Sequence, residues 1–139
     1  MSLLVWRAQK AVGIRVIDEQ HGILLDGLNE LRIALKQGEE CERVRVLLHR
    51  VAQMARMHVA SEERLLEHHH FPGLTEYRAE HQSLLNQLEA RPATCNSANR
   101  YRQSDSVYEL AEFLRTWFVA HTEEAGTVYG PWLQANGVR

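Results

Sequence analysis

The sequence predicts an all-α protein, an antiparallel up-down bundle of four helices. Apolar residues recur at three- and four-residue intervals along most of the chain, instead of alternating as they do in a strand. Only three prolines and eight glycines interrupt the 139 residues. Short connections join the four amphipathic segments, and short connections place consecutive helices antiparallel.

The first two helices are predicted over residues 19–37 and 41–69. Asp18 can cap the first helix at its N-terminus, and Gly38 can end it. The second helix ends at the Phe71-Pro72-Gly73 turn. The inner stripe of the first helix consists of leucines, namely Leu24, Leu25, Leu28, Leu31 and Leu35.

The third and fourth helices are predicted over residues 73–90 and 104–128. The third ends just before an Arg-Pro pair, because the residue preceding a proline disfavours the α conformation. The fourth begins with a cap at Ser104 or Asp105, and the Gly130-Pro131 pair is expected to end it.

Length and composition predict one domain over residues 1–139 and exclude two classes of partner. The chain has 45 % hydrophobic and 24 % charged residues, and its apolar runs fall far short of the ~20 residues of a membrane helix. Its net charge of −2, with the basic residues scattered, provides no stripe for a phosphate backbone. We therefore expect neither membrane nor nucleic acid as a partner; the oligomeric state stays open.

The N-terminus and the cysteines favour a cytoplasmic location. Residues 1–7 contain a brief apolar stretch without the basic leader and cleavage site of a secretory signal. Cys41 and Cys95 lie far apart in predicted inter-helix connections and lack the spacing of paired ligands. We therefore expect neither a disulfide framework nor a thiolate zinc site, as is usual in a reducing compartment.

Histidine is the outlier of the composition, and four of the eight histidines interrupt the apolar stripes, one on each predicted helix. These are His21, His58, His81 and His121. Glu62 follows His58 by four residues, so the two side chains share one helix face. A single inward histidine is usually a hydrogen-bonded core residue, but burying this many polar groups without partners is costly, and an ion would compensate for it. Nitrogen and carboxylate donors without thiolates suit iron, manganese or zinc.

Several motifs follow one another in a recognisable order: Ile17-Asp-Glu-Gln-His21, His58-Val-Ala-Ser-Glu62-Glu63, Phe71-Pro72 with Glu80-His81, and Trp117 with His121 and Tyr129. In this order the chain resembles the bacteriohemerythrin family over nearly its whole length. The resemblance implies a hemerythrin-like bundle with a non-haem di-iron site that binds O₂ at one iron. It implies that His21 and His58 bind one iron, that His81 and His121 bind the other, and that Glu62 bridges them.

Two positions depart from the family pattern. Tyr77 stands where the family has the first histidine of a His-x-x-x-His pair. It can bind a ferric ion as a phenolate, or it can be a core aromatic with a hydrogen-bonded hydroxyl. Gly126 stands where the family supplies a bridging aspartate, which would leave a coordination position open. Neither Glu123 nor Glu124 is on the helix face that would replace it.

The His68-His69-His70 run at the end of the second helix provides further imidazoles. His69 or His70 can fold in from the following turn as a replacement ligand. Alternatively, these histidines have no metal-binding role, because the helix dipole alone favours histidine in a last helical turn.

Three functions are compatible with the sequence, and whether the protein is an enzyme stays open. The first is a non-haem iron protein that binds or senses O₂, with two irons expected from the resemblance and one possible. The second is an oxidoreductase that handles peroxide or nitric oxide at an open ferric site, and the third is a structural bundle that has lost its metal. The predicted metal ligands are His21, His58, Glu62, Tyr77, His81 and His121.

Overall fold

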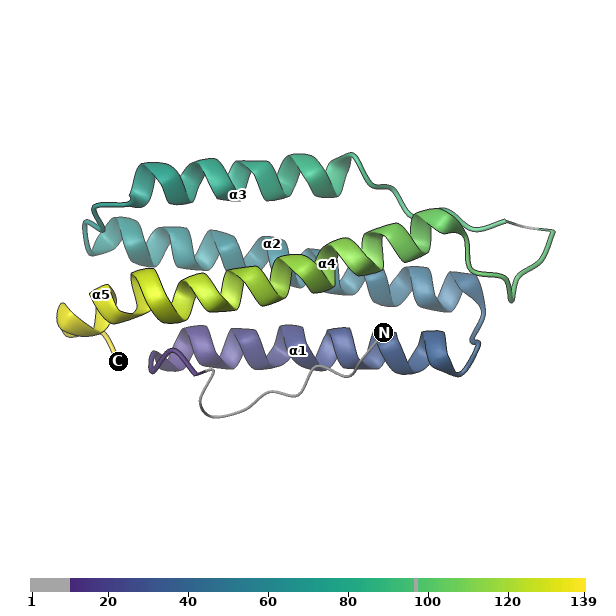
Figure 1. The fold of residues 1–139 in the computed structure, drawn as a ribbon, viewed down its shortest axis with the longest axis horizontal. Coiled ribbons are helices and arrows are strands. Elements are labelled where there is room, and N and C mark those ends of the chain that lie inside the picture. The colour runs from purple at the N-terminus through teal and green to yellow at the C-terminus, as the bar shows by residue number, and fades with distance from the viewer. Residues whose placement is uncertain (1–10, 97) are drawn as a thin grey trace.

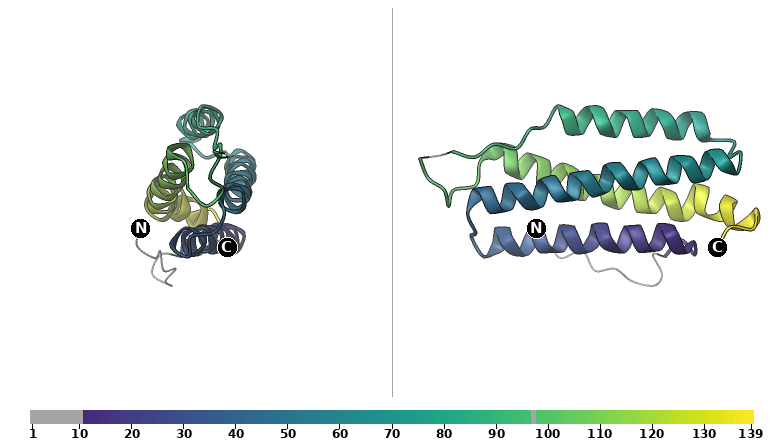
Figure 2. Two further views of the ribbon diagram at one scale, coloured as in Figure 1. Left: turned by 90° about the vertical axis from the view of Figure 1, so that its right-hand side faces the viewer. Right: turned by 180° about the vertical axis from the view of Figure 1, so that it is seen from behind.

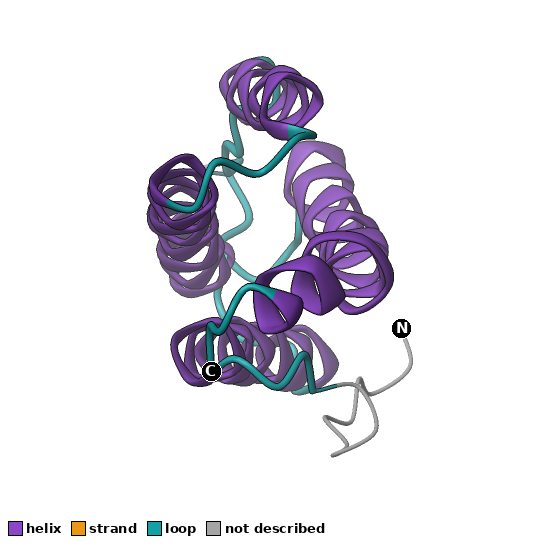
Figure 3. Cartoon of the chain, turned by 90° about the vertical axis from the view of Figure 1, so that its left-hand side faces the viewer, coloured by secondary structure: helices purple, strands orange, loops and turns teal. Residues whose placement is uncertain are grey.

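The computed structural model describes residues 11–96 and 98–139, and among them it contains helices and no strands. Four long helices run side by side, each antiparallel to the one before it in the chain (Figure 1), so the predicted bundle is confirmed. Seen end-on, α1 and α3 lie on opposite sides of the shared interior, as do α2 and α4 (Figures 2 and 3). The elements are α1 (Arg15–Lys36), α2 (Cys41–His68), α3 (Leu74–Glu89), α4 (Asp105–Glu124), the π-helix η2 (Ala125–Tyr129) and α5 (Gly130–Ala135).

The predicted helix boundaries agree closely with the structure except at the start of α1. The carboxylate of Asp18 accepts hydrogen bonds from the backbone N–H groups of Val12 (2.7 Å) and Gly13 (3.0 Å). Asp18 therefore lies within the first turn and holds the preceding segment, and the helix begins at Arg15. Ser104 caps α4 as expected, because its hydroxyl accepts the Val107 N–H.

The chain does not end its last helix at Gly130-Pro131, so that prediction is wrong. α4 passes into η2, and α5 then begins at Gly130, with Pro131 in its first turn, where a missing N–H costs no hydrogen bond. Leu133 is fully buried, and the side-chain amide of Gln134 donates to the Val12 carbonyl (3.0 Å). The C-terminal residues therefore pack on the bundle, against the segment that precedes α1.

Two apolar clusters fill the bundle, and a polar layer separates them. The larger cluster includes Leu24–Leu31 of α1 and Val107–Phe118 of α4. The smaller one consists of Val12, Ile14, Ile17, Leu66, Tyr77, Ala125, Tyr129 and Leu133. Four polar side chains buried along these same stripes, between the two clusters, are His21, His58, Glu62 and His121. Apolar packing on both sides thus keeps this polar layer away from bulk water.

A disulfide joins Cys41 to Cys95, with the two Cα atoms 5.9 Å apart, so the expectation that the cysteines stay unpaired is wrong. Cys41 is the first residue of α2, and Cys95 lies in the connection between α3 and α4. That connection folds back onto the start of α2, where the Cys41 N–H donates to the Arg100 carbonyl (2.7 Å). Sequence spacing cannot reveal this return of the chain, because it depends on how the helices pack.

In the part of the chain that the structure describes, no helix is both long and apolar enough to cross a bilayer. The cytoplasmic location stays a prediction, and the Cys41–Cys95 bond removes the cysteine argument for it.

Candidate metal centre

Three histidines and one glutamate from three helices meet in the polar layer. His21 comes from α1, His58 and Glu62 from α2, and His121 from α4. Their exposed fractions are 0 %, 2 %, 1 % and 8 %. Each offers one ligand atom, and these atoms all lie within 4.8 Å of one another. The structure thus brings together four of the six predicted ligands.

Four of the six distances between these donor atoms are those of a coordination sphere around one ion. The Nε2 atom of His58 is 3.0 Å from Nε2 of His21 and 3.1 Å from Nε2 of His121. Oε1 of Glu62 is 3.4 Å from Nε2 of His21 and 3.2 Å from Nε2 of His121, and it also contacts Nε2 of His58. Donors about 2.1 Å from a shared ion are separated by about 3.0 Å in an octahedral and 3.4 Å in a tetrahedral arrangement. The residues therefore fit a single bound cation.

The electrostatics of the layer favour an ionised Glu62 and a neutral His58. Burial alone would raise the pKa of Glu62, but the His121 charge and hydrogen bonds from His121 and His21 hold it well below its ordinary value. Burial lowers the pKa of His58, and its contact with Glu62 offsets this only in part. An ionised carboxylate and a neutral imidazole are the ligand forms of these side chains.

Two tyrosines hold the other oxygen of Glu62. The hydroxyl of Tyr77 donates to Oε2 at 3.0 Å, and the hydroxyl of Tyr129 donates to the same atom at 2.5 Å. Burial raises the pKa of both phenols, and the Glu62 charge raises it further. Both tyrosines therefore stay protonated and act as hydrogen-bond donors, so ligation of a metal by the Tyr77 phenolate stays a prediction.

Tyr129 belongs to the motifs that carry the family resemblance, but the sequence did not indicate which side chains it contacts. It follows His121 by eight residues, which on a regular α-helix is about 80° around the axis. The π-helix Ala125–Tyr129 takes up one additional residue in its turn and so moves Tyr129 onto the His121 face. Its hydroxyl lies 3.3 Å from Nε2 of His121. A wide helical turn of this kind has no clear signature in the sequence.

His81 lies outside the four-residue group. Its Nδ1 atom is hydrogen-bonded to Oε1 of Glu63 (3.1 Å), and its side chain is 13 % exposed. Arg78 also approaches this carboxylate. As folded, the ring pairs with Glu63 on α2 and does not join His121, so its role as a ligand also stays a prediction.

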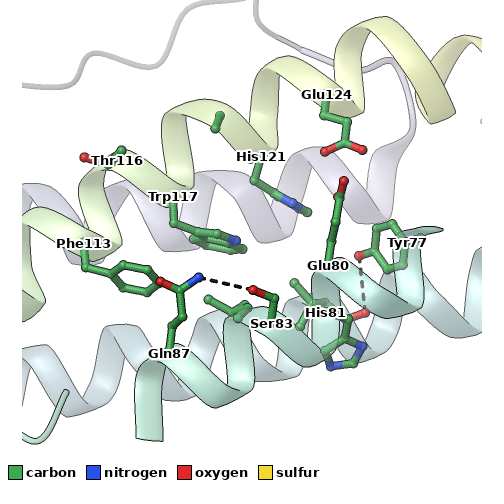
Figure 4. A pocket seen from close by; sticks show the side chains of 13 residues that line it. Tyr77, Glu80, His81, Ser83, Gln87, Phe113, Thr116, Trp117, His121 and Glu124 are labelled. Atoms are coloured by element: carbon green, nitrogen blue, oxygen red, sulfur yellow. Dashed lines mark hydrogen bonds between the residues drawn. The ribbon is translucent and has the colours of Figure 1, made fainter. Parts of the chain in front are cut away.

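An open cavity of about 380 Å³ lies between α3 and α4 and reaches His121. Figure 4 shows Tyr77, Glu80 and Glu124 toward one end of the cavity and Phe113 toward the other, with His121 and Trp117 between them. The Trp117 ring stacks on His121, with the ring centroids 4.8 Å apart. Burial and a hydrogen bond with Glu80 raise the pKa of Glu124, which lines this cavity and is not in the four-residue group.

Gly126 lies on the solvent side of η2, and the open coordination position expected from the missing aspartate stays a prediction. Gly126 is exposed, and a Cβ atom built there would have no neighbour within 4 Å. The buried positions next to it are Ala125 and Tyr129. The backbone of η2 therefore turns position 126 toward solvent.

Replacing Gly126 by aspartate is expected to leave the metal content per chain unchanged, because the new carboxylate would project into solvent. Elemental analysis of purified Gly126→Asp beside the wild-type protein measures this. An additional ion in the variant would contradict the observed orientation of η2.

The His68-His69-His70 run lies at the end of α2 and is not part of the group. His68 and His69 pack against each other with ring centroids 5.0 Å apart. His70 has a φ of 59°, a left-handed conformation that helps the chain leave the helix. A replacement ligand from this run stays a prediction.

The comparisons with known proteins agree with this geometry. Residues 12–133 match the family described as the hemerythrin HHE cation binding domain. Bacteriohemerythrin of Stenotrophomonas maltophilia (strain R551-3) is 25 % identical over 137 residues, which are 98 % of this chain and 85 % of that protein. The family resemblance inferred from the motifs is thereby confirmed. With the match extending over most of its length and four convergent side chains in its core that could hold a metal ion, the chain belongs to the hemerythrin HHE cation binding domain family.

Proposed function

We propose that His21, His58, Glu62 and His121 hold one non-haem iron ion and that this protein binds or senses O₂ there. The observation that carries the proposal is the convergence of three Nε2 atoms and one carboxylate oxygen at the spacing of a single coordination sphere. The family's cation-binding character supports a metal, and the bacteriohemerythrin relative supports iron and O₂.

The donor set suits this chemistry. Three imidazoles and one carboxylate are compatible with iron, and four protein ligands leave room for an exogenous one. A ferrous ion bound there would supply the open position at which O₂ coordinates. Tyr77 and Tyr129 hold Oε2 of Glu62, so that Oε1 is aimed at the histidines, and Trp117 restrains the His121 ring.

The cavity between α3 and α4 supports a route for a small ligand. It reaches His121, and part of its wall is apolar, formed by Val59, Leu84 and Phe113. An apolar wall admits a diatomic molecule while disfavouring ordered water. The exogenous ligand is therefore expected beside His121 and not at Gly126.

One ion is proposed because the two departures from the family pattern remove two donors that a second ion would need. Tyr77 replaces a histidine, and its hydroxyl donates to Glu62. Gly126 supplies no donor and is turned to solvent. The resemblance assigns His81 and His121 to that second ion, but His121 lies in the four-residue group, and His81 would first have to leave Glu63.

Three histidine-to-alanine variants test the ligand set through iron content after anaerobic reconstitution. The wild-type protein is expected to bind one iron per chain. His58→Ala should weaken binding by about 100-fold, because four ligands share about 10–16 kcal/mol of binding free energy. His81→Ala and the exposed control His49→Ala should bind as the wild type does.

Two irons in the wild type, reduced to one in His81→Ala, would replace this proposal with the two-ion site of the family. No iron after reconstitution would refute metal binding altogether. The O₂ part is tested separately by the visible spectrum of the reduced, iron-loaded protein: it should change on adding O₂ and reverse on removing it. An unchanged spectrum would leave an iron protein without O₂ binding.

A further inference from the structure

We infer that Gln20 is a positioning residue of the metal centre: its amide holds the proton of His58 on Nδ1, which leaves Nε2 as the ligand atom, and does so without adding charge. This inference rests on the proposed metal site. Gln20 lies on α1 directly before His21, and it contacts no ion in the arrangement described above.

The geometry shows a chain of three side chains that ends on a predicted ligand. Nδ1 of His58 lies 2.7 Å from Oε1 of Gln20. The Nε2 group of Gln20 donates to Oγ of Ser61 at 3.2 Å. On its other side, His58 presents Nε2 to His21, His121 and Glu62. One ring nitrogen is thus committed to Gln20, and the other faces the ligand group.

The chemistry of the amide decides which nitrogen carries the proton. A neutral imidazole has one N–H donor and one acceptor nitrogen, and the hydrogen bond of one nitrogen selects the role of the other. In the structure the Gln20 amide turns its NH₂ group to Ser61 and its oxygen to Nδ1 of His58. An amide oxygen only accepts hydrogen bonds, so in this orientation Nδ1 of His58 is the donor. Nε2 then has a free lone pair for the ion.

Because Gln20 is uncharged, it also affects which charge state of the bound ion is favoured. Glu62 is the only carboxylate in the group of four ligands, so a divalent ion there leaves a net charge of about +1. A glutamate at position 20 would place a second negative charge on the Nδ1 side of His58. It would make the imidazole a stronger donor and would favour a trivalent ion. Gln20 therefore favours the divalent state of the centre, which is the state that binds O₂ in the proposed function.

The Gln20–Ser61 hydrogen bond also joins α1 to α2 next to the proposed ligands on each helix. Gln20 precedes His21 on α1, and Ser61 precedes Glu62 on α2. The Gln20–Ser61 hydrogen bond thus ties the helix of one ligand to the helix of two others. Gln20 is only half-buried, so it can be substituted without replacing a buried side chain.

Three variants test the inference: Gln20→Leu, Gln20→Glu and the control Gln82→Leu. Gln82 is exposed on α3, and its amide contacts only Asn86 among the hydrogen bonds described. The probe is Zn²⁺, with affinity measured by competition with a chelator. Gln20→Leu should bind Zn²⁺ about 10- to 100-fold more weakly. Gln20→Glu should bind at least as tightly as the wild type, and Gln82→Leu should not differ from it.

A second readout does not depend on affinity. In nitrogen-15 spectra of the zinc-loaded wild type, the His58 Nδ1–H proton should be visible and slow to exchange with water. In saturated zinc-loaded Gln20→Leu, the same proton should exchange quickly, and Gln20→Glu should restore its protection. A merely structural role of Gln20 would lower thermal stability in both substitutions without this recovery.

Equal Zn²⁺ affinity and equal Nδ1–H protection in wild type and Gln20→Leu would overturn the inference. The inference would also be overturned if Gln20→Glu bound Zn²⁺ more weakly than the wild type and did not slow the exchange of the His58 Nδ1–H proton. A wild-type protein that binds neither Zn²⁺ nor iron would instead refute the proposed function, so the two failures are distinguishable.

Discussion

Replacing Glu62 by glutamine is expected to weaken iron or Zn²⁺ binding by about 100-fold or more. The substitution keeps the shape of the side chain but removes the only negative charge among the four ligands. It removes about one quarter of a binding free energy of roughly 10–16 kcal/mol. Metal affinity by chelator competition measures the loss, with thermal unfolding of the metal-free variant as a check that it folds.

Glu63→Gln is the matched control, because Glu63 is the next residue and pairs with His81. It should change metal affinity by less than about 3-fold, since the four-residue group does not contain Glu63 or His81. If both substitutions weakened binding equally, Glu63 and His81 would be serving an ion, and the single-ion arrangement would be wrong.

Cys95→Ser is expected to lower the free energy of unfolding by about 4 kcal/mol under non-reducing conditions. The disulfide spans 54 residues, and a crosslink of that span removes about this much loop-closure free energy from the unfolded chain. For a chain of this size the melting temperature should fall by about 10–15 °C. Denaturant and thermal unfolding measure both quantities. Cys95 is the better choice because it is only half-buried, whereas Cys41 is fully buried and would lose packing as well.

The control for this prediction is the reduced wild-type protein, whose stability should match that of Cys95→Ser. Metal content should be the same in both proteins, because His58 lies about 25 Å along α2 from Cys41 at 1.5 Å per residue. Identical stability of the wild type with and without reductant would show that the two thiols are not bonded in solution.

Hydrogen bonds within the polar layer explain how the bundle keeps four polar side chains in its interior. His21, His58, His121 and Glu62 hydrogen-bond to one another even without an ion, and both phenols of Tyr77 and Tyr129 donate to Glu62. Buried polar groups are tolerated only when they find such partners. The same contacts that stabilise the metal-free layer hold the donors at the spacing that one cation needs.

The four helices and the inward orientation of the four clustered side chains follow from the local spacing of residues along the chain. The spacing of apolar residues determines the four helices, and the positions of His21, His58, Glu62 and His121 on those stripes determine that their side chains point inward. Both are properties of a 3.6-residue period and need no knowledge of which helices are neighbours.

Only the tertiary structure decided which inward residues meet. His81 has the same inward pattern as the other three histidines, yet a neighbouring carboxylate, Glu63, engages it. The turn of η2 moves Tyr129 into the site and Gly126 out of it, because one widened helical turn rotates everything that follows it. Cys41 and Cys95 meet because the connection after α3 returns to the start of α2. Helical periodicity is local and can be read along the chain, whereas rotamers, a π-turn and the path of a long connection depend on contacts between distant residues.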